Sequence, residues 1–449
     1  MANVQRPDVL IIGSGPAGGA VARTCAAAGK QVVVADYQPF GGTCPLRGCE
    51  PKKFLFDVTN VALRRMHMTE RGLRGCLSID WNKMMTAMAA MRDPIPQLVE
   101  EFYAKSGITG VHGKAQFLAP DTVFINGIHY EPDHIVIAAG AKPRPLSFPG
   151  HELLTSTDQF FEMKELPSRI VFIGGGFIAF ELSHVAAIAG AQVDVVLRSD
   201  RFLRRFDPAM VECMIEASRD MGVRFHTMLP PNSLTRDHND LVLCAGEDNI
   251  EFRADCVVAA AGRIAHVEDL NPEQGELELN QKGGISVNEF MQSTSNSRVY
   301  AAGDVVGNSM ELTPVASMEG MIVAHNILNG NEETPDYSVV PYTLFTHPPL
   351  STVGLREEEA LAQNVLCKVL EGSAAGWSEY RRIGELYPAY KVLVSEDNKI
   401  LGATVNGHNS EEIINIFAFA MRTKTTVDEL NKWLWAYPSF GYTIRYMFK

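Results

Sequence analysis

Two cysteines in one short segment are the residues whose types and spacing best indicate chemistry. Residues 41–53 read GGTCPLRGCEPKK, so Cys44 and Cys49 are five positions apart and basic side chains flank them. On an undistorted helix the two side chains would point about 140° apart, but Pro45 and Gly48 favour a distortion between them. Because cationic neighbours and a helix start lower a thiol pKa, we expect two reactive thiols that form a redox pair.

The pair has two alternative interpretations, which are buried structural thiols and half of a metal site. Eight cysteines in 449 residues are too few and too scattered for a disulfide framework. A metal site would need a second pair of Cys or His ligands at short spacing. The other cysteines are isolated, namely Cys25, Cys76, Cys213, Cys244, Cys256 and Cys367. The sequence therefore favours the redox interpretation.

A glycine-rich turn near the N-terminus predicts a dinucleotide site. The run Asp8-Val9-Leu10-Ile11-Ile12, apolar from residue 9, precedes Gly13, Gly15 and Gly18 in the pattern GxGxxG, and the next predicted strand ends at Asp36. In such a βαβ unit the glycines make a tight turn, let the backbone approach a pyrophosphate and let helix and strand pack closely. The helix start binds the phosphates. An acid about 20 residues later accepts the ribose hydroxyls, which fits Asp36.

The same pattern returns in the middle of the chain. Residues 169–173 precede Gly174 and Gly176, and a helix through Ala189 and a strand over residues 192–197 follow. A repeated dinucleotide-binding unit implies two dinucleotide sites in one chain. Two nucleotides in one protein indicate that electrons pass from one to the other.

Two further apolar strands end in small residues, at Gly140 and at Asp304. Ligands in α/β proteins lie at such strand ends, although each pattern also fits a buried strand that stops at a turn. After Pro335, strand-like and helical runs alternate without a glycine-rich phosphate loop. This change predicts a separate α+β domain at the C-terminus.

Charge and hydropathy exclude several function classes. The chain has 40 Lys and Arg against 53 Asp and Glu, a formal net charge of −13, and no basic run that would follow a phosphate backbone. Nucleic acid is therefore not expected as a partner. No apolar run reaches the ~18–20 residues of a membrane span, and the N-terminus lacks the pattern of a secretory signal. We expect a cytoplasmic protein without a membrane partner.

These motifs, in this order and over nearly the whole chain, resemble the class I pyridine nucleotide-disulfide oxidoreductases. That family includes glutathione reductase, dihydrolipoamide dehydrogenase and mercuric reductase. The resemblance rests on both dinucleotide motifs, the C-x4-C-x-P-K-K segment, residues 301–304 (AAGD), residues 312–316 (LTPVA) and the C-terminal domain. It implies an α/β fold with two Rossmann-like dinucleotide-binding domains and a C-terminal α+β dimerisation domain. The expected parts are a FAD-binding domain (1–148), an NAD(P)-binding domain (149–264), a return to the FAD domain (265–335) and a dimerisation domain (336–449).

The resemblance also assigns roles to residues of the redox site. Cys49 would lie against the flavin ring and form a charge-transfer thiolate, and Cys44 would be the interchange thiol that meets the substrate. Lys52 and Glu181 match an ion pair that family members place beside flavin N5. For Glu181, a solvated helix charge is the alternative. The helix after Pro314 would present its N-terminus to the flavin.

The cofactor-binding residues follow from the same resemblance. FAD would be held by the first glycine motif, by Asp36 and by Asp304, which would bind the ribityl chain. The complete implied set for both nucleotides is Gly13, Gly15, Gly18, Asp36, Gly42, Thr43, Gly140, Asp304, Gly174, Gly176, Arg198, Arg204 and Gly262.

The end of the second nucleotide-binding strand favours NADPH. An NAD enzyme needs a carboxylate there to bind both ribose hydroxyls, and Leu197 occupies this place. Arg198 and Arg204 can make charge-assisted bonds to a 2′-phosphate and match the arginine pair of NADPH-dependent members. Surface arginines that follow a strand by chance are the alternative.

The C-terminus departs from the family pattern. Members that reduce disulfides carry a His-Pro followed closely by Glu, and this dyad reaches the partner subunit's active site, so these members are dimers. Here Tyr437 replaces the histidine and Tyr442 the glutamate. An unperturbed phenol has a pKa of about 10 and is a poor base at neutral pH. Tyr437 is then either the acid for an undemanding thiol exchange or the mark of a reaction other than disulfide reduction.

The sequence therefore predicts a homodimeric FAD enzyme that passes electrons from NADPH to Cys44–Cys49 and on to a small disulfide or thiol-reactive compound. One alternative keeps the relay for thioether cleavage, carboxylation, or metal or quinone reduction. Another is an electron-transfer subunit that serves a protein-borne disulfide or lipoyl group. The aromatic side chains near Tyr437 line a substrate pocket or pack a dimer interface. No metal is expected.

Overall fold

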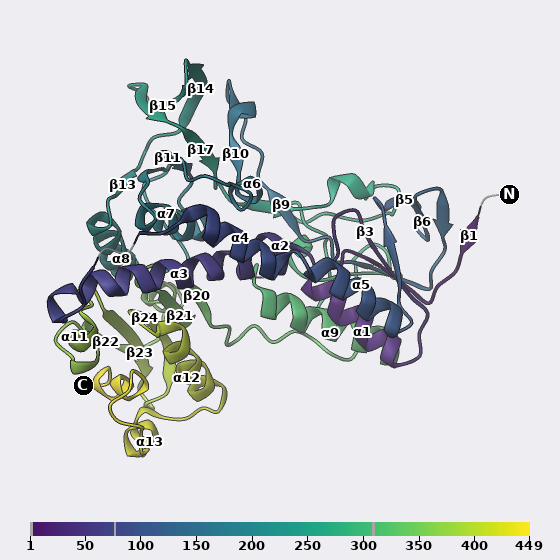
Figure 1. Cartoon of the computed structure of the whole chain (residues 1–449). Coiled ribbons are helices and arrows are strands. Elements are labelled where there is room, and N and C mark those ends of the chain that lie inside the picture. Colours follow the sequence, from purple (N-terminus) through teal and green to yellow (C-terminus); the bar gives the residue numbers. More distant parts are fainter. Residues whose placement is uncertain (1–2, 76–77, 308–309) are drawn as a thin grey trace. The chain divides into compact units, whose positions relative to one another are not determined.

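The computed structural model describes residues 3–75, 78–307 and 310–449 (Figure 1). The chain forms two compact units, and each is built from three separate segments. The first unit comprises Met1–Pro51, Ala87–Arg144 and Arg263–Asp336. The second comprises Lys52–Thr86, Pro145–Gly262 and Tyr337–Lys449.

A parallel five-stranded sheet forms the centre of the first unit, in the order β19-β8-β2-β3-β4. Three of its strands are almost entirely buried and rich in Val and Ile, which is typical of a sheet covered on both faces. The carboxyl ends of all five strands lie at one edge, where the glycine-rich turn begins. The strands are β19 (Val299–Ala301), β8 (His134–Ile137), β2 (Val9–Ile12), β3 (Val32–Asp36) and β4 (Thr109–His112).

Helices α1 (Pro16–Ala27) and α9 (Thr313–Asn329) cross very closely beside this sheet. A Cβ atom on Gly320 would lie 2.4 Å from the carbonyl oxygen of Ala17, so only glycine allows this approach. The buried carboxylate of Glu319, also on α9, accepts a 2.6 Å hydrogen bond from the Gly303 N–H. This bond fixes α9 to the end of β19.

The remaining elements of the first unit are short. A mixed sheet has the order β1-β7-β6-β5, and β18 pairs with β9 in an antiparallel ribbon. The elements are β1 (Val4–Gln5), β5 (Gln116–Ala119), β6 (Thr122–Ile125), β7 (Ile128–Tyr130), β9 (Ala141–Pro143), β18 (Arg263–Ala265), α2 (Thr43–Arg47), α5 (Ile95–Lys105), η3 (Glu268–Leu270) and η4 (Asp304–Val306).

The second unit contains a parallel sheet in the order β10-β17-β11-β12-β13, which repeats the strand, turn and helix pattern of the first unit. A three-stranded antiparallel meander, β14-β15-β16, is inserted before β17. These elements are β10 (Thr155–Ser156), α6 (Thr157–Phe160), β11 (Arg169–Ile173), α7 (Phe177–Ile188), β12 (Gln192–Val196), α8 (Pro208–Asp220), β13 (Val223–His226), β14 (Pro231–Asp237), β15 (Asp240–Ala245), β16 (Ile250–Ala254), β17 (Cys256–Ala259) and η2 (His151–Leu153).

An antiparallel sheet, β20-β21-β24-β23-β22, and the helices on it complete the second unit. Its central strands β23 (Ala389–Ser395) and β24 (Ile400–Asn406) are largely buried under α12 (Ser410–Arg422). The other elements are β20 (Tyr342–Leu344), β21 (Leu350–Gly354), α10 (Glu357–Ala362), β22 (Cys367–Ser373), α11 (Ser378–Ile383), α13 (Val427–Lys432) and η5 (Gly441–Tyr446).

Helices α3 (Cys49–His67) and α4 (Trp81–Arg92) belong to both units, because the division falls within each of them. The 3₁₀ turn η1 (Thr69–Arg71) follows α3. The predicted bounds at residues 148, 264 and 335 stay a prediction, although the ends of the observed segments fall close to each. The sequence interpretation did not anticipate that residues 52–86 group with the nucleotide and C-terminal segments. Across the described residues, no helix is both long and apolar enough to span a bilayer.

Candidate functional site

A break between two helices positions the cysteine pair. Helix α2 carries Cys44 and ends at Arg47; the next residue, Gly48, has a non-helical backbone (φ −138°, ψ −111°), and α3 begins at Cys49. A Cβ atom at Gly48 would lie 2.9 Å from the Thr43 carbonyl oxygen. The predicted distortion between the two cysteines is therefore present. It places the two thiols on different helices, so the 140° separation of a continuous helix does not apply.

The two thiols interact directly. Cys44 is hydrogen bonded to Cys49, and this bond is the main reason why the pKa of the Cys44 thiol is raised; burial raises it further. The expectation that both thiols have lowered pKa values is thus wrong for Cys44. The hydrogen bond and the loss of solvent both favour the neutral thiol of Cys44 over its thiolate.

Thr313, the first residue of α9, is a site residue to which the sequence interpretation gave no role of its own. Its Oγ1 lies 3.5 Å from the Cys49 Sγ, and its hydroxyl lowers the pKa of Cys44 against the larger effects that raise it. The LTPVA motif was recognised as a family feature, but only the packing of α9 brings this hydroxyl to the cysteines.

Four glycines form a cradle at the carboxyl edge of the first sheet. Gly13 has φ +111°, and a Cβ atom there would lie 2.1 Å from the Ala138 carbonyl oxygen. A Cβ at Gly18 would lie 2.0 Å from the Gly13 oxygen, and one at Gly42 would lie 2.5 Å from the Gly15 Cα. The space beside Gly15 itself stays open, since its own Cβ would meet only the Gly42 Cα at 3.9 Å. This arrangement brings bare backbone to the helix start that binds phosphate.

Asp36 interacts with the glycine-rich turn in this structure. Its Oδ2 accepts hydrogen bonds from the Ser14 N–H (2.9 Å) and hydroxyl (2.7 Å), and its Oδ1 accepts one from the Gln38 N–H. The Ser14 hydroxyl oxygen in turn accepts a bond from the Gly41 N–H. Ser14 thereby links Asp36 to the segment that carries the cysteines.

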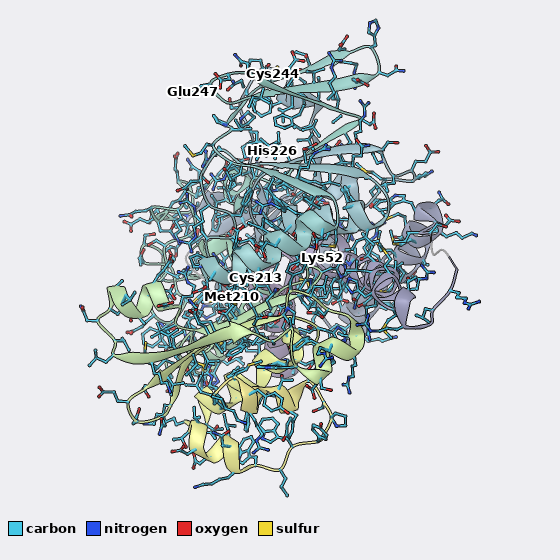
Figure 2. All side chains as sticks on the ribbon, turned by 90° about the vertical axis from the view of Figure 1, so that its left-hand side faces the viewer. Lys52, Met210, Cys213, His226, Cys244 and Glu247 are labelled. Carbon is cyan, nitrogen blue, oxygen red and sulfur yellow. The ribbon has the colours of Figure 1, made fainter. Side chains whose placement is uncertain are left out.

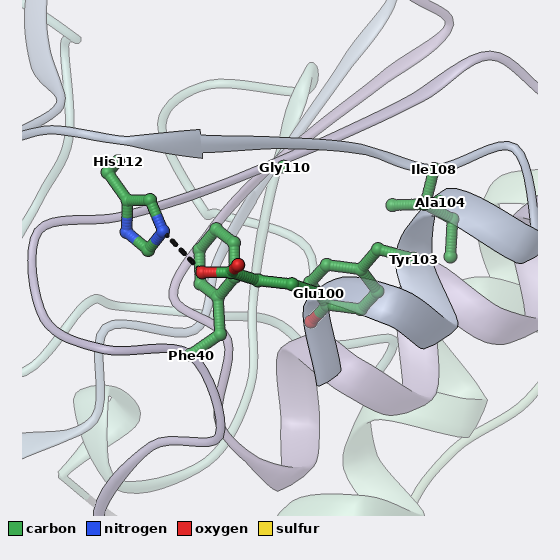
Figure 3. Close-up of a pocket in the computed structure, with 7 residues that line it drawn as sticks. All are labelled: Phe40, Glu100, Tyr103, Ala104, Ile108, Gly110 and His112. Atoms are coloured by element: carbon green, nitrogen blue, oxygen red, sulfur yellow. Dashed lines mark hydrogen bonds and ion pairs between the residues drawn. The ribbon is translucent and has the colours of Figure 1, made fainter. Parts of the chain in front are cut away.

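A pocket of about 300 Å³ lies beside Asp36, between α5 and β4 (Figure 3). In it the rings of Phe40 and His112 stack 4.2 Å apart, and His112 Nε2 lies 2.9 Å from a Glu100 carboxylate oxygen. Burial and the nearby Asp36 charge raise the pKa of Tyr103 to about 12. None of the predicted site residues lines this pocket, whose walls are Phe40, Glu100, Tyr103, Ala104, Ile108, Gly110 and His112.

Asp304 and Gly140 follow the ends of β19 and β8, two strands that pair with each other. Burial, together with the charge of Glu311, raises the pKa of Asp304 to about 6. Arg263 lowers it, and the Arg263 guanidinium also donates to the Ala141 carbonyl oxygen. Gly140 has φ +68° and open space where a Cβ would project. Both residues therefore lie at the sheet edge predicted from their strands.

Lys52 and Glu181 form an ion pair inside the second unit. The Lys52 Nζ lies 2.5 Å from Glu181 Oε2, and the second carboxylate oxygen accepts a bond from the Phe345 N–H. The Glu181 side chain is 3% exposed, which excludes the alternative of a solvated helix charge. The ring of Phe177 lies 5.1 Å from the ammonium nitrogen. Figure 2 marks Lys52.

The second glycine-rich turn has the same local design. Gly174 has φ +136°, and its Cβ would lie 2.2 Å from the Ala260 carbonyl oxygen, whereas the spaces beside Gly176 and Gly262 are open. The Leu197 side chain packs against the turn, because a Cβ at Gly175 would lie 2.8 Å from it. An apolar side chain thus fills the place where an NAD enzyme carries its acid.

The two arginines after β12 are exposed to solvent. The Arg204 guanidinium lies 3.3 Å from a neighbouring carboxylate, Asp200, and both partners of this ion pair are largely exposed. The one acid on β12, Asp194, is bound by Arg224 and His226, so its pKa is lowered to about 2 despite its burial. Asp194 is therefore not available to bind a ribose.

Tyr437 lies on an exposed loop between α13 and η5. Its side chain is 67% exposed, and its ring meets the Tyr442 ring edge-on at 4.9 Å. The neighbouring Leu434 is fully exposed, whereas Phe440 packs inward against Tyr380. The loop thus exposes Tyr437 to solvent and is attached to the rest of the unit by the packing of Phe440 on Tyr380.

Comparisons with known proteins agree with this geometry. Residues 7–320 match the family described as pyridine nucleotide-disulphide oxidoreductase, and residues 340–447 match its dimerisation domain. The chain belongs to the class I pyridine nucleotide-disulfide oxidoreductase family. It is 29% identical over 447 residues to dihydrolipoyl dehydrogenase of Bacillus subtilis (strain 168), which covers 97% of this chain and 96% of that protein.

Solved structures show the same fold. The HOCl-induced flavoprotein disulfide reductase RclA from Escherichia coli superposes with a TM-score of 0.89, at 24% identity, over 98% of this chain and 99% of RclA. A copper(II) complex of an RclA mutant gives 0.90 over 99% of both chains at the same identity. The predicted fold of paired dinucleotide-binding units and a C-terminal dimerisation domain is confirmed.

This oxidoreductase family uses FAD and a pyridine nucleotide, and the first glycine cradle fits such a group. Gly15 and Gly42 approach each other without side chains between them, so a pyrophosphate could lie against bare backbone at the start of α1. Gly13, Gly15, Gly18, Gly42 and the residues after β19 would hold FAD. FAD supplies two-electron exchange between a nicotinamide and a disulfide.

Other nucleophiles and acid–base groups of this family member lie outside these sites. Burial raises the pKa of Cys25 to about 11, and Cys76 lies outside the described residues. His347 is buried with its Nε2 3.0 Å from the Thr59 hydroxyl, and burial lowers its pKa well below the usual value. Burial lowers the pKa of His408 to about 4. Among the described residues, no three His, Cys, Asp or Glu side chains gather as a metal site.

Two adjacent glycines of α1 provide a test of the cradle. We expect Gly18→Ala to lose bound FAD and to lower the free energy of unfolding by about 1–3 kcal/mol, because its Cβ would overlap the Gly13 oxygen. Gly19→Ala is the control, since its Cβ would meet only the flexible Arg23 guanidinium at 3.4 Å. Flavin absorbance per protein and chemical denaturation measure both effects. Equal FAD content in the two variants would contradict the assignment.

Proposed function

We propose that this oxidoreductase passes electrons from NADPH, with FAD, to a Cys44–Cys49 disulfide and on to a small disulfide or a related thiol-reactive compound. The observation that carries the proposal is the hydrogen bond between Cys44 and Cys49 across the helix break, with the Thr313 hydroxyl beside both. Two thiols in such contact can close to a disulfide and reopen.

The thiol exchange balances without a further reactant. The Cys44 sulfur attacks one sulfur of the substrate disulfide, and the first substrate thiolate leaves. Cys49 gives the proton that it took from Cys44 to this thiolate, then attacks Cys44 as a thiolate and releases the second substrate thiolate. Two protein thiols become one disulfide, and two substrate sulfurs each gain an electron and a proton. NADPH supplies the electrons that restore the dithiol.

The hydrogen bond with Cys49 and burial raise the pKa of the Cys44 thiol. We propose that, when the reduced pair has lost one proton, Cys44 keeps the other and Cys49 carries the negative charge. This distribution agrees with Cys49 as the thiol nearest the flavin and Cys44 as the interchange thiol. Cys44 must then lose its proton to attack, and the Cys49 thiolate is the base already in contact with it.

NADPH, rather than NADH, is proposed for the second nucleotide site. Leu197 cannot bind ribose hydroxyls, and Asp194 is occupied by Arg224 and His226. The exposed guanidinium groups of Arg198 and Arg204 supply the charge that a 2′-phosphate needs.

Tyr437 is proposed to act as an acid in the partner subunit of a homodimer. The dimerisation domain and the outward-facing loop with Leu434 and Tyr437 support this arrangement. A phenol can protonate a departing thiolate but is a poor base at neutral pH. The natural substrate is therefore one whose thiolates leave without much help.

A non-disulfide reaction and an electron-transfer role for a protein-borne disulfide are the alternatives. The replaced dyad at Tyr437 and Tyr442 favours the former. A substrate panel should therefore include copper(II) and a quinone beside small disulfides. A stable complex with a second protein on native purification would favour the latter.

Thiol counting under anaerobic conditions tests the redox pair. We expect one equivalent of NADPH to convert one disulfide into two titratable thiols per subunit in the wild type. Cys49→Ser should show no gain, whereas Cys213→Ser, a partly exposed thiol elsewhere, should show the full gain. If Cys49→Ser also gained two titratable thiols, the assignment of Cys44 and Cys49 as the redox pair would be wrong.

Thr313 provides a pH-dependent test. Thr313→Val removes a hydrogen bond that favours thiolate, so we expect the alkylation of the NADPH-reduced pair to shift to higher pH by about one unit. Thr313→Ser keeps the hydroxyl and should retain the wild-type pH profile. Superimposable profiles for the valine variant and the wild type would refute a role for this hydroxyl.

Tyr437 distinguishes the proposed reaction from its non-disulfide alternative. Tyr437→Phe should lower turnover of a small disulfide. Tyr437→His should change this turnover by less than about tenfold, because the proposed substrate needs little help from an acid or base. Where a reaction does need such a group, it can contribute about 10²–10⁴-fold. Steady-state kinetics at neutral pH measure both. A rise of about a hundredfold or more in Tyr437→His would show that the natural site is not built for ordinary disulfides.

A further inference from the structure

Two residues of the dimerisation domain (residues 340–447, below called the dimerisation part) are hydrogen bonded to the backbone at Arg204 and Arg205. The anchored segment, residues 201–207, follows β12 and leads into α8, and α8 packs on β23 and β24. In Figure 2 the labelled Met210 and Cys213 lie on α8 beside the light green strands. The segment thus lies between the nucleotide sheet and the dimerisation sheet, inside one compact unit.

Two hydrogen bonds hold the backbone at and after Arg204. The Tyr342 hydroxyl donates to the Arg205 carbonyl oxygen at 2.6 Å, and the Arg356 Nη1 donates to the Arg204 carbonyl oxygen at 2.8 Å. Both donors belong to the dimerisation part. The Tyr342 ring also packs 5.0 Å from the Phe206 ring.

Ion pairs hold both ends of the segment. At its start, the Arg201 guanidinium binds both oxygens of Glu358, at 2.9 and 3.2 Å. At its end, the buried Asp207 caps α8 with one oxygen and lies 3.1 Å from the Lys391 Nζ with the other. The Lys391 ammonium is itself shared with Glu357 and Glu371. The partners of Arg201 and Asp207 lie on α10 and β23, and Lys391 is also paired with Glu371 on β22.

The held backbone is strained immediately before Arg204. Leu203 is buried and has φ +45°, a left-handed conformation that a bulky residue adopts only when its surroundings impose it. Its N–H donates to the Gly175 carbonyl oxygen at 2.9 Å, which ties the segment to the second glycine-rich turn. The Leu203–Gly175 hydrogen bond therefore holds the backbone before Arg204 at the second glycine-rich turn, and the bonds from Tyr342 and Arg356 help to keep the left-handed conformation of Leu203.

We propose that Tyr342 and Arg356, from the dimerisation part, are positioning residues that set the preference for the 2′-phosphate of NADPH by fixing the presentation of Arg204. The inference rests on the proposed use of NADPH. Neither residue touches the nucleotide; each acts through the backbone at Arg204 and Arg205. Tyr342 and Arg356 are bonded to the backbone of residues 205 and 204, and the glycine turn is bonded to Leu203, so we expect their loss to affect the 2′-phosphate contact more than the binding of NADH.

The experiment compares two double variants of the purified holoenzyme. Tyr342→Phe/Arg356→Gln removes both backbone anchors. Tyr387→Phe/Arg253→Gln is the matched control: Tyr387 bonds Asp220 at the far end of α8, and Arg253 pairs with Asp237 in the meander. Arg204→Ala marks the full loss of the phosphate contact. Michaelis constants for NADPH and NADH are measured with each.

We expect Arg204→Ala to lower the ratio of kcat/KM for NADPH over NADH by about ten- to a hundredfold, the value of a hydrogen bond to a charged group. The anchor variant should lower it about three- to tenfold, through KM for NADPH, with kcat unchanged. The control should keep the wild-type ratio. A purely structural role would weaken NADPH and NADH equally, which would overturn the inference.

The outcomes separate the inference from the function on which it rests. If the wild type prefers NADH, the proposed use of NADPH fails. If the wild type prefers NADPH and Arg204→Ala abolishes that preference while the anchor variant keeps it, only the inference fails. Binding titrations with adenosine 2′,5′-bisphosphate and with ADP compare a ligand that carries the 2′-phosphate with one that lacks it, and so give the same comparison without turnover. Tyr342→Phe alone, which removes one oxygen, serves if the double variant does not fold, and an unchanged preference for the bisphosphate would again refute the inference.

Discussion

The close crossing of α1 and α9 is the constraint on which the first site depends. Gly320 lets α9 approach the Ala17 carbonyl oxygen, and the Glu319 carboxylate fixes that approach to the Gly303 N–H at the end of β19. The crossing brings the glycine cradle and the Thr313 hydroxyl to the same edge of one sheet. Without it, Cys49 would lack its contact with Thr313, and Cys44 would lose the hydroxyl that lowers its pKa.

In the second unit, buried ion pairs connect the elements, whereas in the first unit glycines let the helices pack closely. Two buried acids there are met by a cation or an N–H: Glu181 by Lys52 and the Phe345 N–H, and Asp207 by Lys391. A buried carboxylate without such partners would be costly. These pairs connect α3, the nucleotide sheet and the dimerisation sheet within one unit, so nucleotide binding and dimerisation share a single framework.

Much of the fold could be predicted from local pattern, because glycine spacing and buried strands carry a strong signal. Gly13 and Gly174 were recognised from sequence, and each has the positive φ that its turn requires. The thiol pKa could not be predicted, because it depends on a contact between two helices whose break was expected but whose geometry was not. The bonds from Tyr342 and Arg356 also could not be predicted, since they join residues 137 and 152 positions apart, and the positive φ at Leu203 lies in the backbone next to the residues that they hold.

The segmented construction of both units determines when the protein can fold during synthesis. Strand β19 completes the first sheet by pairing with β8, yet some 160 residues separate the two in the chain. The second unit in turn lacks its dimerisation sheet until the last segment is made. Neither unit can complete its sheets while only its first segment has left the ribosome. The thiols therefore remain accessible to oxidants until late in translation.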